Sequence, residues 1–367
     1  MPFVLFRGYS SLCLNLCGFA SLRDIFLRFL SFFRGYSVVN TCYQKAVDTI
    51  DWLLDSDPAI RWQTLRDLTD ASPAAIAAER ARIPHEGISA EILARQQPDG
   101  SWCRAETPVW LSTLFTMQLL RATGIDSTDP IVASAVSRPV ANLRWNDQGS
   151  WDLRPAELGG NPFFEGEVEP CINGGVLALG ASFGHPNENL VRRLLSEQLE
   201  DGGWNCEAPE STRSSFNTTI CVLEGMLEYQ RAVGFTPEVA AARRRGEQYL
   251  LERNLFRRRS TGEIANPEFL ELAYPPRYHY DILRALDYLR AAEVEPDPRM
   301  NEAIHLIESK RQPEGHWLLD RAYDEGLALQ FDESTGEPSR WNTLRALRVL
   351  RWYQQTSPQR REEHKGR

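Results

Sequence analysis

The sequence of 367 residues has no apolar run near the ~20 residues that a membrane-spanning helix needs. It also has no Gly-rich phosphate loop, no His-Glu-x-x-His, no Cys-x-x-Cys and no Asp-Asp-x-x-Asp motif. The commonest signatures of nucleotide binding, zinc proteolysis and magnesium-assisted diphosphate ionisation are therefore missing. No segment shows a strand pattern, so we expect an all-α protein.

Charge and cysteine content narrow the class further. The net charge is −9, which argues against nonspecific nucleic-acid binding, so we expect no nucleic-acid partner. Seven cysteines are scattered along a long chain in an odd number, a usage typical of a reduced, cytoplasmic protein rather than a disulfide scaffold.

The first 43 residues differ from the rest, because they are rich in Phe and Leu and carry four arginines against one aspartate. Three interpretations stay open: a basic amphipathic segment on a membrane surface, a disordered or mis-assigned extension, and a cleaved signal. We divide the chain into this extension (1–43), a helical domain (44–355) and a disordered charged tail (356–367).

A Gly-x-Trp connector recurs along the domain. Its tryptophans are Trp102, Trp151, Trp204 and Trp317. The first three are separated by 49 and 53 residues, and a worn copy at 261–264, with Ile264 in place of Trp, divides the longer last interval. A fixed period of this length is typical of a repeat architecture. We expect the connector tryptophans to pack between neighbouring hairpins and to be structural.

Each connector lies between two helical patterns, the second more apolar than the first. The expected outer helices are 43–54, 74–97, 130–143, 187–199, 237–254 and 299–310. The expected inner helices include 111–120, 172–183, 218–229, 282–289 and 344–352. Because segment 61–68 is nearly repeated at 340–347, we expect the first and last units to touch in a closed ring. The predicted fold is an (α/α)6 toroid of six helical hairpins.

The connectors resemble the QW-type repeats of squalene–hopene cyclases and the matching repeats of protein prenyltransferase β subunits. The resemblance covers about residues 43–352. It implies an α/α toroid with a cavity for an isoprenoid or polyprenyl substrate. Cyclases of the family usually carry two such domains and this chain has room for one, which argues against full triterpene cyclisation.

One position near the start of every inner helix is the candidate substrate contact. Its occupants are Trp62, Trp110, Cys171, Phe216, His279 and Trp341. We expect the aromatic members, with Tyr278, to line an apolar cavity, where their rings would stabilise a carbocation or simply fill the core. The helix N-termini would gather at one mouth and favour an anionic group.

The third inner helix is where the resemblance places the chemistry. Cyclases carry Asp-x-Asp-Asp-Thr there and prenyltransferases a zinc-binding Asp-x-Cys, whereas this chain has Glu169, Cys171 and Asn173 at 169–173. The standard acid motif is therefore absent. Glu169, Cys171 and His279 are a weak candidate zinc set, because His279 lies two inner helices further on; the alternative is an unmetallated thiol and a hydrogen-bonded histidine.

Other acids are candidates for proton transfer. Asp281 is the most interesting, because it lies at the head of an inner helix, where burial would raise the pKa of a carboxyl group. The acidic stretches 165–169 and 320–333 are alternatives, or solvated loop charge.

These patterns leave three functions open. The first is a cyclase-like or prenyltransferase-like enzyme with catalytic candidates Glu169, Cys171, His279 and Asp281. The second is a noncatalytic isoprenoid or lipid binder, and the third a carbohydrate-active α/α barrel. In the first two the partner is an apolar small molecule, with peripheral membrane contact possible through the extension.

Overall fold

The computed structural model describes residues 49–103, 107–147 and 152–356. The expected extension, the C-terminal tail beyond Thr356 and the connector Trp151 lie outside these residues. The chain divides into two units, 1–49 and 50–367, and the architecture below is that of the second. None of the described helices is long and apolar enough to cross a membrane.

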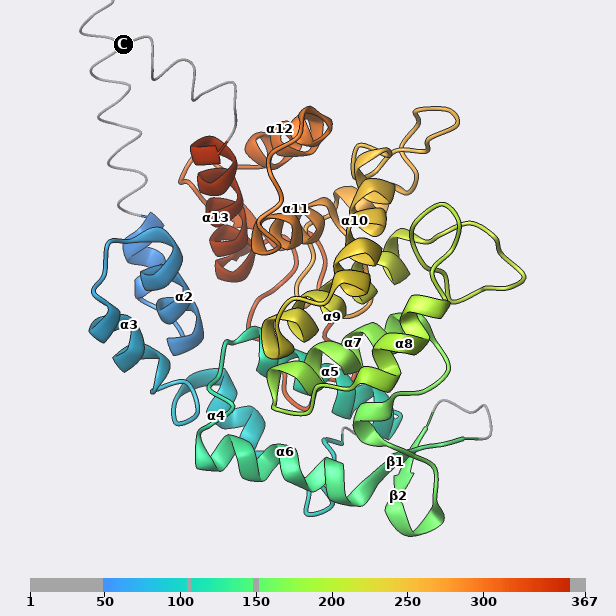
Figure 1. Ribbon diagram of the computed structural model, residues 1–367. Coiled ribbons are helices and arrows are strands. Elements are labelled where there is room, and N and C mark those ends of the chain that lie inside the picture. The colour runs from blue at the N-terminus through green and yellow to red at the C-terminus, as the bar shows by residue number, and fades with distance from the viewer. Residues whose placement is uncertain (1–48, 104–106, 148–151, 357–367) are drawn as a thin grey trace, which may run out of the picture. The chain divides into compact units, whose positions relative to one another are not determined.

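The described residues are mostly helical, as expected (Figure 1). The inner helices are α2 (Pro58–Leu68), α5 (Val109–Ala122), α7 (Pro170–Ser182), α9 (Phe216–Val233), α11 (Ile282–Ala291) and α13 (Arg340–Thr356). The outer helices are α3 (Pro73–Arg80), α4 (Gly87–Ala94), α6 (Pro130–Asn142), α8 (Glu188–Ser196), α10 (Pro237–Leu251) and α12 (Asn301–Ser309). Four 3-10 turns, η1 (Ala156–Leu158), η2 (Phe163–Glu165), η3 (Pro267–Leu270) and η4 (Pro298–Met300), lie in the connections.

Two expectations about secondary structure were wrong. The helix expected at 74–97 is split into α3 and α4, because Pro84 offers no N–H and Gly87 adopts a positive φ of 66°. Short antiparallel ribbons also occur. They are formed by β1 (Leu143–Trp145) between β2 (Leu153–Pro155) and β3 (Asn161–Pro162), and by β4 (Trp317–Leu318) with β5 (Pro338–Ser339). Strands of two or three residues are too short for an alternating pattern to reveal them.

Three helices begin with the same combination of a capping residue and a proline. Asp57, Ser72 and Asp129 each precede a proline and accept a hydrogen bond from a backbone N–H of the first turn. Proline at the first helical position sets φ for the helix and loses no intrahelical bond, so cap and proline together fix where the helix begins.

The connector tryptophans hold inner and outer helices together. Trp102, Trp204 and Trp317 are fully buried, and each indole N–H donates to an outer-helix carbonyl ten residues earlier at 2.7 Å. Each backbone N–H donates to a threonine hydroxyl of the following inner helix at 2.9–3.1 Å. The glycine two residues before each tryptophan has a φ of 95–99°, a conformation that favours glycine. The structural role expected for these three is confirmed, whereas Ile264 in the worn copy is 39% exposed.

The inner helices contact one another in a closed circuit. Gln63 of α2 donates to the carbonyl of Ala122 at the end of α5 (3.1 Å), and α5, α7 and α9 pack in order. Arg284 of α11 pairs with Glu224 of α9. Arg348 of α13 binds both α11 and Gln63, which joins the last inner helix to the first. The expectation that the first and last units touch is confirmed.

The closest approach in this circuit is between α7 and α9. A side-chain carbon on Gly174 would lie 2.5 Å from the backbone of Cys221, and one on Gly225 would lie 2.4 Å from the carbonyl of Gly174. These two glycines let the backbones of α7 and α9 touch, and so bring the residues at their N-termini close together.

Candidate functional site

The inner helices enclose a cavity of about 660 Å³. All six contribute to its wall, α13 through its N-terminal half and the others chiefly through their C-terminal halves, so it lies towards the ends of α5, α7, α9 and α11. Eight arginines line it: Arg66, Arg80, Arg121, Arg231, Arg284, Arg290, Arg345 and Arg348. Five carboxylates face them: Asp67, Glu224, Glu228, Asp287 and Glu293. The wall therefore carries an excess of positive charge, although the whole chain is acidic.

Part of this arginine content has a structural cause. The last carbonyls of a helix have no partner within it, and cations are favoured at that end. Arg80 donates to the carbonyl of Gly124, just beyond α5, at 2.9 Å. Arg231 donates to that of Ala291, the last residue of α11, at 2.6 Å. Several guanidinium groups thus cap the helices that converge here.

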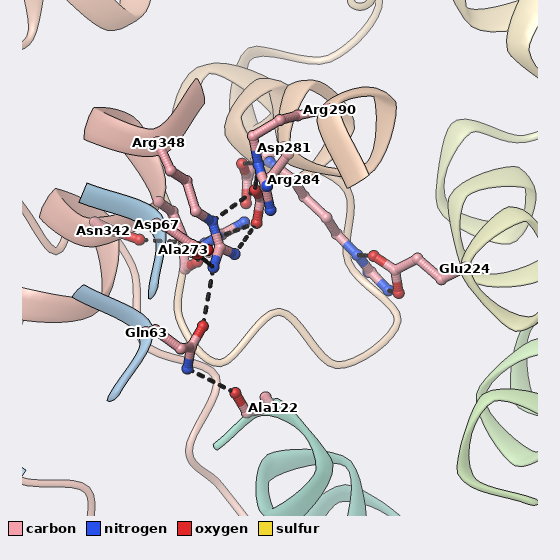
Figure 2. A network of polar contacts seen from close by, with 12 residues as sticks. Gln63, Asp67, Ala122, Glu224, Ala273, Asp281, Arg284, Arg290, Asn342 and Arg348 are labelled. Carbon is pink, nitrogen blue, oxygen red and sulfur yellow. Dashed lines mark hydrogen bonds and ion pairs between the residues drawn. The ribbon is translucent and has the colours of Figure 1, made fainter. Parts of the chain in front are cut away.

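Asp287 is the centre of an ionic network in the cavity wall, and Figure 2 labels its partners Arg348 and Arg290. Its carboxylate accepts two hydrogen bonds from Arg348, one of them at 2.7 Å, and one from Arg290 at 2.9 Å. Arg345 adds a weaker ion pair at 3.9 Å. Burial alone would raise the pKa of Asp287, but the charges of Arg348 and Arg290 hold it well below its ordinary value. Asp287 is therefore ionised at neutral pH.

A second pair closes the wall between α9 and α11. The guanidinium of Arg284 binds the carboxylate of Glu224 through two bonds of 2.8 and 2.7 Å, as Figure 2 shows. Burial opposes both charges, yet their attraction lowers the pKa of Glu224 and raises that of Arg284. The pKa of Asp67 is likewise lowered, because the hydrogen bond and charge of Arg66 outweigh burial. These three cavity carboxylates are acceptors and not acids at neutral pH.

Some polar groups of the wall have no protein partner. The Nε of Arg121, the hydroxyl of Tyr274 and the hydroxyl of Ser182 are buried and unbonded among the described residues. Arg121 has only a loose ion pair of 3.8 Å to Glu228. Tyr274 is 3% exposed, and burial raises the pKa of its hydroxyl, so it stays a donor. Buried donors without partners are costly, and a ligand that accepts from them recovers that cost.

Two of the predicted cavity residues, Trp62 and Trp341, do lie on this wall. The ring of Trp62 is flanked by the guanidinium carbons of Arg66 and Arg80, 4.4 and 5.2 Å from its centroid. Trp341 stacks on Tyr274 at 4.7 Å. The face of Trp62 is thus already engaged by protein cations and is not free for a carbocation.

The other predicted aromatic residues lie elsewhere. Phe216 packs in a cluster with Tyr249, Phe269 and Tyr280, at centroid distances of 5.0–5.5 Å. Trp110 packs against Phe115, 6.1 Å away, which in turn contacts Tyr278 at 5.9 Å. Polar and ionic groups supply most of the wall of this cavity, and the expected apolar, aromatic-lined cavity stays a prediction.

Asp281 is buried, with 1% of its surface exposed, and its carboxylate caps α11 by accepting from the backbone N–H of Arg284 at 2.8 Å. Burial raises its pKa, against the charge of Arg345. It belongs to the polar network of Figure 2, but it is not among the residues lining the cavity. Its predicted catalytic role stays a prediction.

The predicted zinc set is brought together only in part. The Cys171 thiol donates to Glu169 Oε2 at 3.4 Å, and the third potential ligand atom within 4.8 Å of both is the sulfur of Cys206. His279 is not in this group; its ring stacks on Tyr323 at 3.6 Å. Burial and the charges of nearby arginines lower the pKa of His279 to about 4, so it is neutral. Only the close contact of α7 and α9 reveals the neighbours of Cys206.

The acidic stretches divide into buried and solvated parts. Burial raises the pKa of Glu167 to about 7, and its two oxygens accept from the backbone N–H groups of Val168 and Glu169. Glu333 accepts from the N–H of Arg340 at the start of α13. Glu325 is exposed. These contacts indicate helix and loop stabilisation.

Sequence reasoning missed the ionic wall itself. Arg284, Asp287 and Arg290 are spaced three apart on α11, and Arg345 and Arg348 repeat that spacing on α13. Charges repeated at helical spacing along two inner helices were the available signal.

No family model and no curated protein matches the chain. Among solved structures, the type II terpene cyclase MstE from Scytonema is similar at 16% identity, over 85% of this chain and 99% of that one, with a TM-score of 0.45. A variant of that cyclase with its product, merosterolic acid A, gives 14% identity, 88% and 99% coverage and a TM-score of 0.45. A variant with its substrate, geranylgeranyl dihydroxybenzoate, is 16% identical over 86% of this chain and 98% of that one, with a TM-score of 0.43. Similarity at this level establishes neither a family nor an activity for this chain.

Proposed function

We propose that the protein binds a small organic anion inside the helical ring. The anionic group is a phosphate ester or a free carboxylate. The observation that supports this is the excess of arginines over carboxylates around a 660 Å³ cavity, with the donors of Arg121 and Tyr274 unused. The volume lies within the range of about 300–1,000 Å³ typical of small-molecule sites. Inside a ring of low dielectric constant, hydrogen bonds and ion pairs from these donors stabilise an anion more than they would at a protein surface.

The ligand also has an apolar part in this proposal. Trp62, Ile125, Phe183, Leu227 and Trp341 share the wall with the arginines. An isoprenoid chain ending in a diphosphate or carboxylate has both features, and the resemblance of the connectors to QW-type repeats favours that class. With it we propose the complete (α/α)6 toroid of six hairpins as the scaffold.

Calorimetric titration with three probes separates the parts of this proposal. Farnesyl diphosphate should bind at least about tenfold more tightly than farnesol, because one charge-assisted hydrogen bond contributes roughly 1.5–3 kcal/mol. Inorganic diphosphate should bind more weakly than farnesyl diphosphate. Equal affinity for farnesol and its diphosphate would refute charge recognition, and equal affinity for the diphosphate with and without its chain would refute the isoprenoid part.

Arg121→Ala tests the position of the anion. This variant should lose about tenfold or more in affinity for farnesyl diphosphate, while its free energy of unfolding changes by under about 1 kcal/mol, because its ion pair to Glu228 is loose. Arg154→Ala, which removes a partly exposed ion pair to Asp147 between two residues that do not line the cavity, is the matched control and should leave affinity unchanged. Unchanged affinity in Arg121→Ala would place the anion elsewhere.

A cyclase-like enzyme is the second candidate, favoured by the buried Asp281 and its raised pKa. A carboxyl group whose pKa is raised is better suited to act as a general acid than Asp287, Glu224 and Asp67, whose pKa values are lowered. Incubation with farnesyl and geranylgeranyl diphosphate and squalene, read by mass spectrometry, tests it. Cyclised product that disappears in Asp281→Asn supports the enzyme, and binding without turnover supports the binder.

A further inference from the structure

A second site lies where the N-termini of α7 and α9 meet. Cys171 is the second residue of α7 and Thr218 the third of α9. Cys206 lies in the loop between the buried Trp204 and the start of α9, and its sulfur is 3.3 Å from the Thr218 hydroxyl. The contact of Gly174 with the backbone of α9 is what brings these elements within reach of one another.

Three ligand-type atoms converge there. One carboxylate oxygen of Glu169 and the sulfurs of Cys171 and Cys206 all lie within 4.8 Å of one another. Two thiolates bound to one zinc ion at about 2.3 Å in a tetrahedron are about 3.8 Å apart. A contraction of at most about 1 Å therefore turns the present arrangement into a coordination shell, a shift within the reach of side-chain rotation.

The surroundings favour the anionic ligands that a metal needs. Both helix N-termini carry positive partial charge, which stabilises thiolates. A divalent cation bound between these groups would offset the negative charges of the two thiolates and of the Glu169 carboxylate.

We propose that Glu169, Cys171 and Cys206 bind a thiophilic divalent cation, zinc, and leave one coordination position open. Two sulfurs and one carboxylate oxygen suit zinc rather than magnesium or calcium, which take oxygen ligands. Three protein ligands with a fourth position free is the arrangement in which zinc accepts a water molecule or a substrate atom. The assignment departs from the prenyltransferase pattern, because Cys206 and not His279 completes the set.

Metal content of the full chain tests the proposal directly. Protein purified under a thiol-free reductant, loaded with zinc and dialysed, should retain a single zinc ion per chain by elemental mass spectrometry. Replacing zinc with cobalt(II) should give the sulfur-to-metal charge-transfer absorption of a thiolate site. Cys171→Ser and Cys206→Ser should each lose the retained metal and this absorption.

Two controls distinguish this site from others. Cys103→Ser removes a cysteine that follows a connector tryptophan, as Cys206 does, but is exposed and outside the cluster. His279→Ala removes the histidine expected from the sequence. Both should retain the metal. Circular dichroism of every variant checks that it is folded. If a cysteine variant unfolds, Glu169→Gln, which keeps both thiols, tests the same site. Its affinity for zinc should be at least about tenfold lower than that of the parent chain.

Several results would overturn the assignment. They are no zinc in the loaded parent chain, zinc retained in folded Cys206→Ser, or loss of zinc in His279→Ala equal to that in Cys171→Ser. Anion binding in the cavity is measured with other probes on the same chain. A negative result for zinc therefore does not decide the proposed anion-binding function.

Discussion

Asp287→Asn is the perturbation that most directly tests the ionic wall. The substitution keeps the shape of the side chain and removes its charge, which leaves Arg348 and Arg290 beside a neutral amide. The side chains of Asp287 and Arg348 are only 14% and 12% exposed. Removing one partner of a buried ion pair costs about 3–5 kcal/mol, because the remaining charge is uncompensated. The folding equilibrium should therefore fall by roughly two to four orders of magnitude.

Urea unfolding followed by circular dichroism measures this loss. Asp147→Asn is the matched control, because Asp147 is 51% exposed in its 2.8 Å pair with Arg154, and exposed pairs contribute about 0–1 kcal/mol. The loss in free energy of unfolding caused by Asp287→Asn should also depend on pH. The folded pKa of Asp287 is below its ordinary 3.8, so its contribution is complete above that value and is lost as pH falls below it.

Two outcomes would refute the reasoning. A loss in Asp287→Asn no larger than in Asp147→Asn would show that the network is not a stabilising element. A deficit that stays constant as pH is lowered below about 4 would show that the charge of Asp287 is not the source of the effect.

Other substitutions test the scaffold and its electrostatics. Trp204→Phe removes the indole bond to the carbonyl of Leu194 and leaves space, so thermal unfolding should show a loss of about 2–4 kcal/mol. Gly174→Ala places a methyl group against the backbone of α9 and should cost about 1–3 kcal/mol, whereas Gly175→Ala meets only the movable end of a glutamine and should cost less; equal losses would contradict the close-contact argument. Burial raises the pKa of Glu167 to about 7, so the unfolded chain loses this proton first and folding weakens as pH rises. Glu167→Gln should therefore gain stability relative to the parent between about pH 5 and 8, and a difference independent of pH would contradict this.

The helices were predictable because their signals are local. Apolar spacing placed most helices within a few residues, and the Gly-x-Trp connectors placed the turns between them. The near repeat of 61–68 at 340–347 also predicted the contact of α2 with α13. The break between α3 and α4 was missed, since Pro84 and Gly87 lie in a segment whose apolar spacing continues.

The site was less predictable, because it depends on depth within the ring. Trp62, the fifth residue of α2, and Trp341, the second of α13, both lie on the cavity wall, so the position of an aromatic residue within its helix does not by itself decide whether it reaches the cavity. Phe216 packs against three aromatic neighbours and lies outside the wall. The more charged helices were expected outside, and the bonds of Arg80 and Arg231 to helix-end carbonyls account for part of the arginine content of the wall.

The bond between Arg348 and Gln63 spans 285 positions of the chain. During synthesis the ribosome delivers α2 well before α13, so while the intervening helices emerge Asp287 lacks its bidentate partner and α2 lacks its neighbour. A nascent chain that ends before residue 348 cannot form the bond that closes the circuit of inner helices. The finished cavity therefore requires both α2 and α13, and a binding signal from a stalled chain would appear only when α13 has left the exit tunnel.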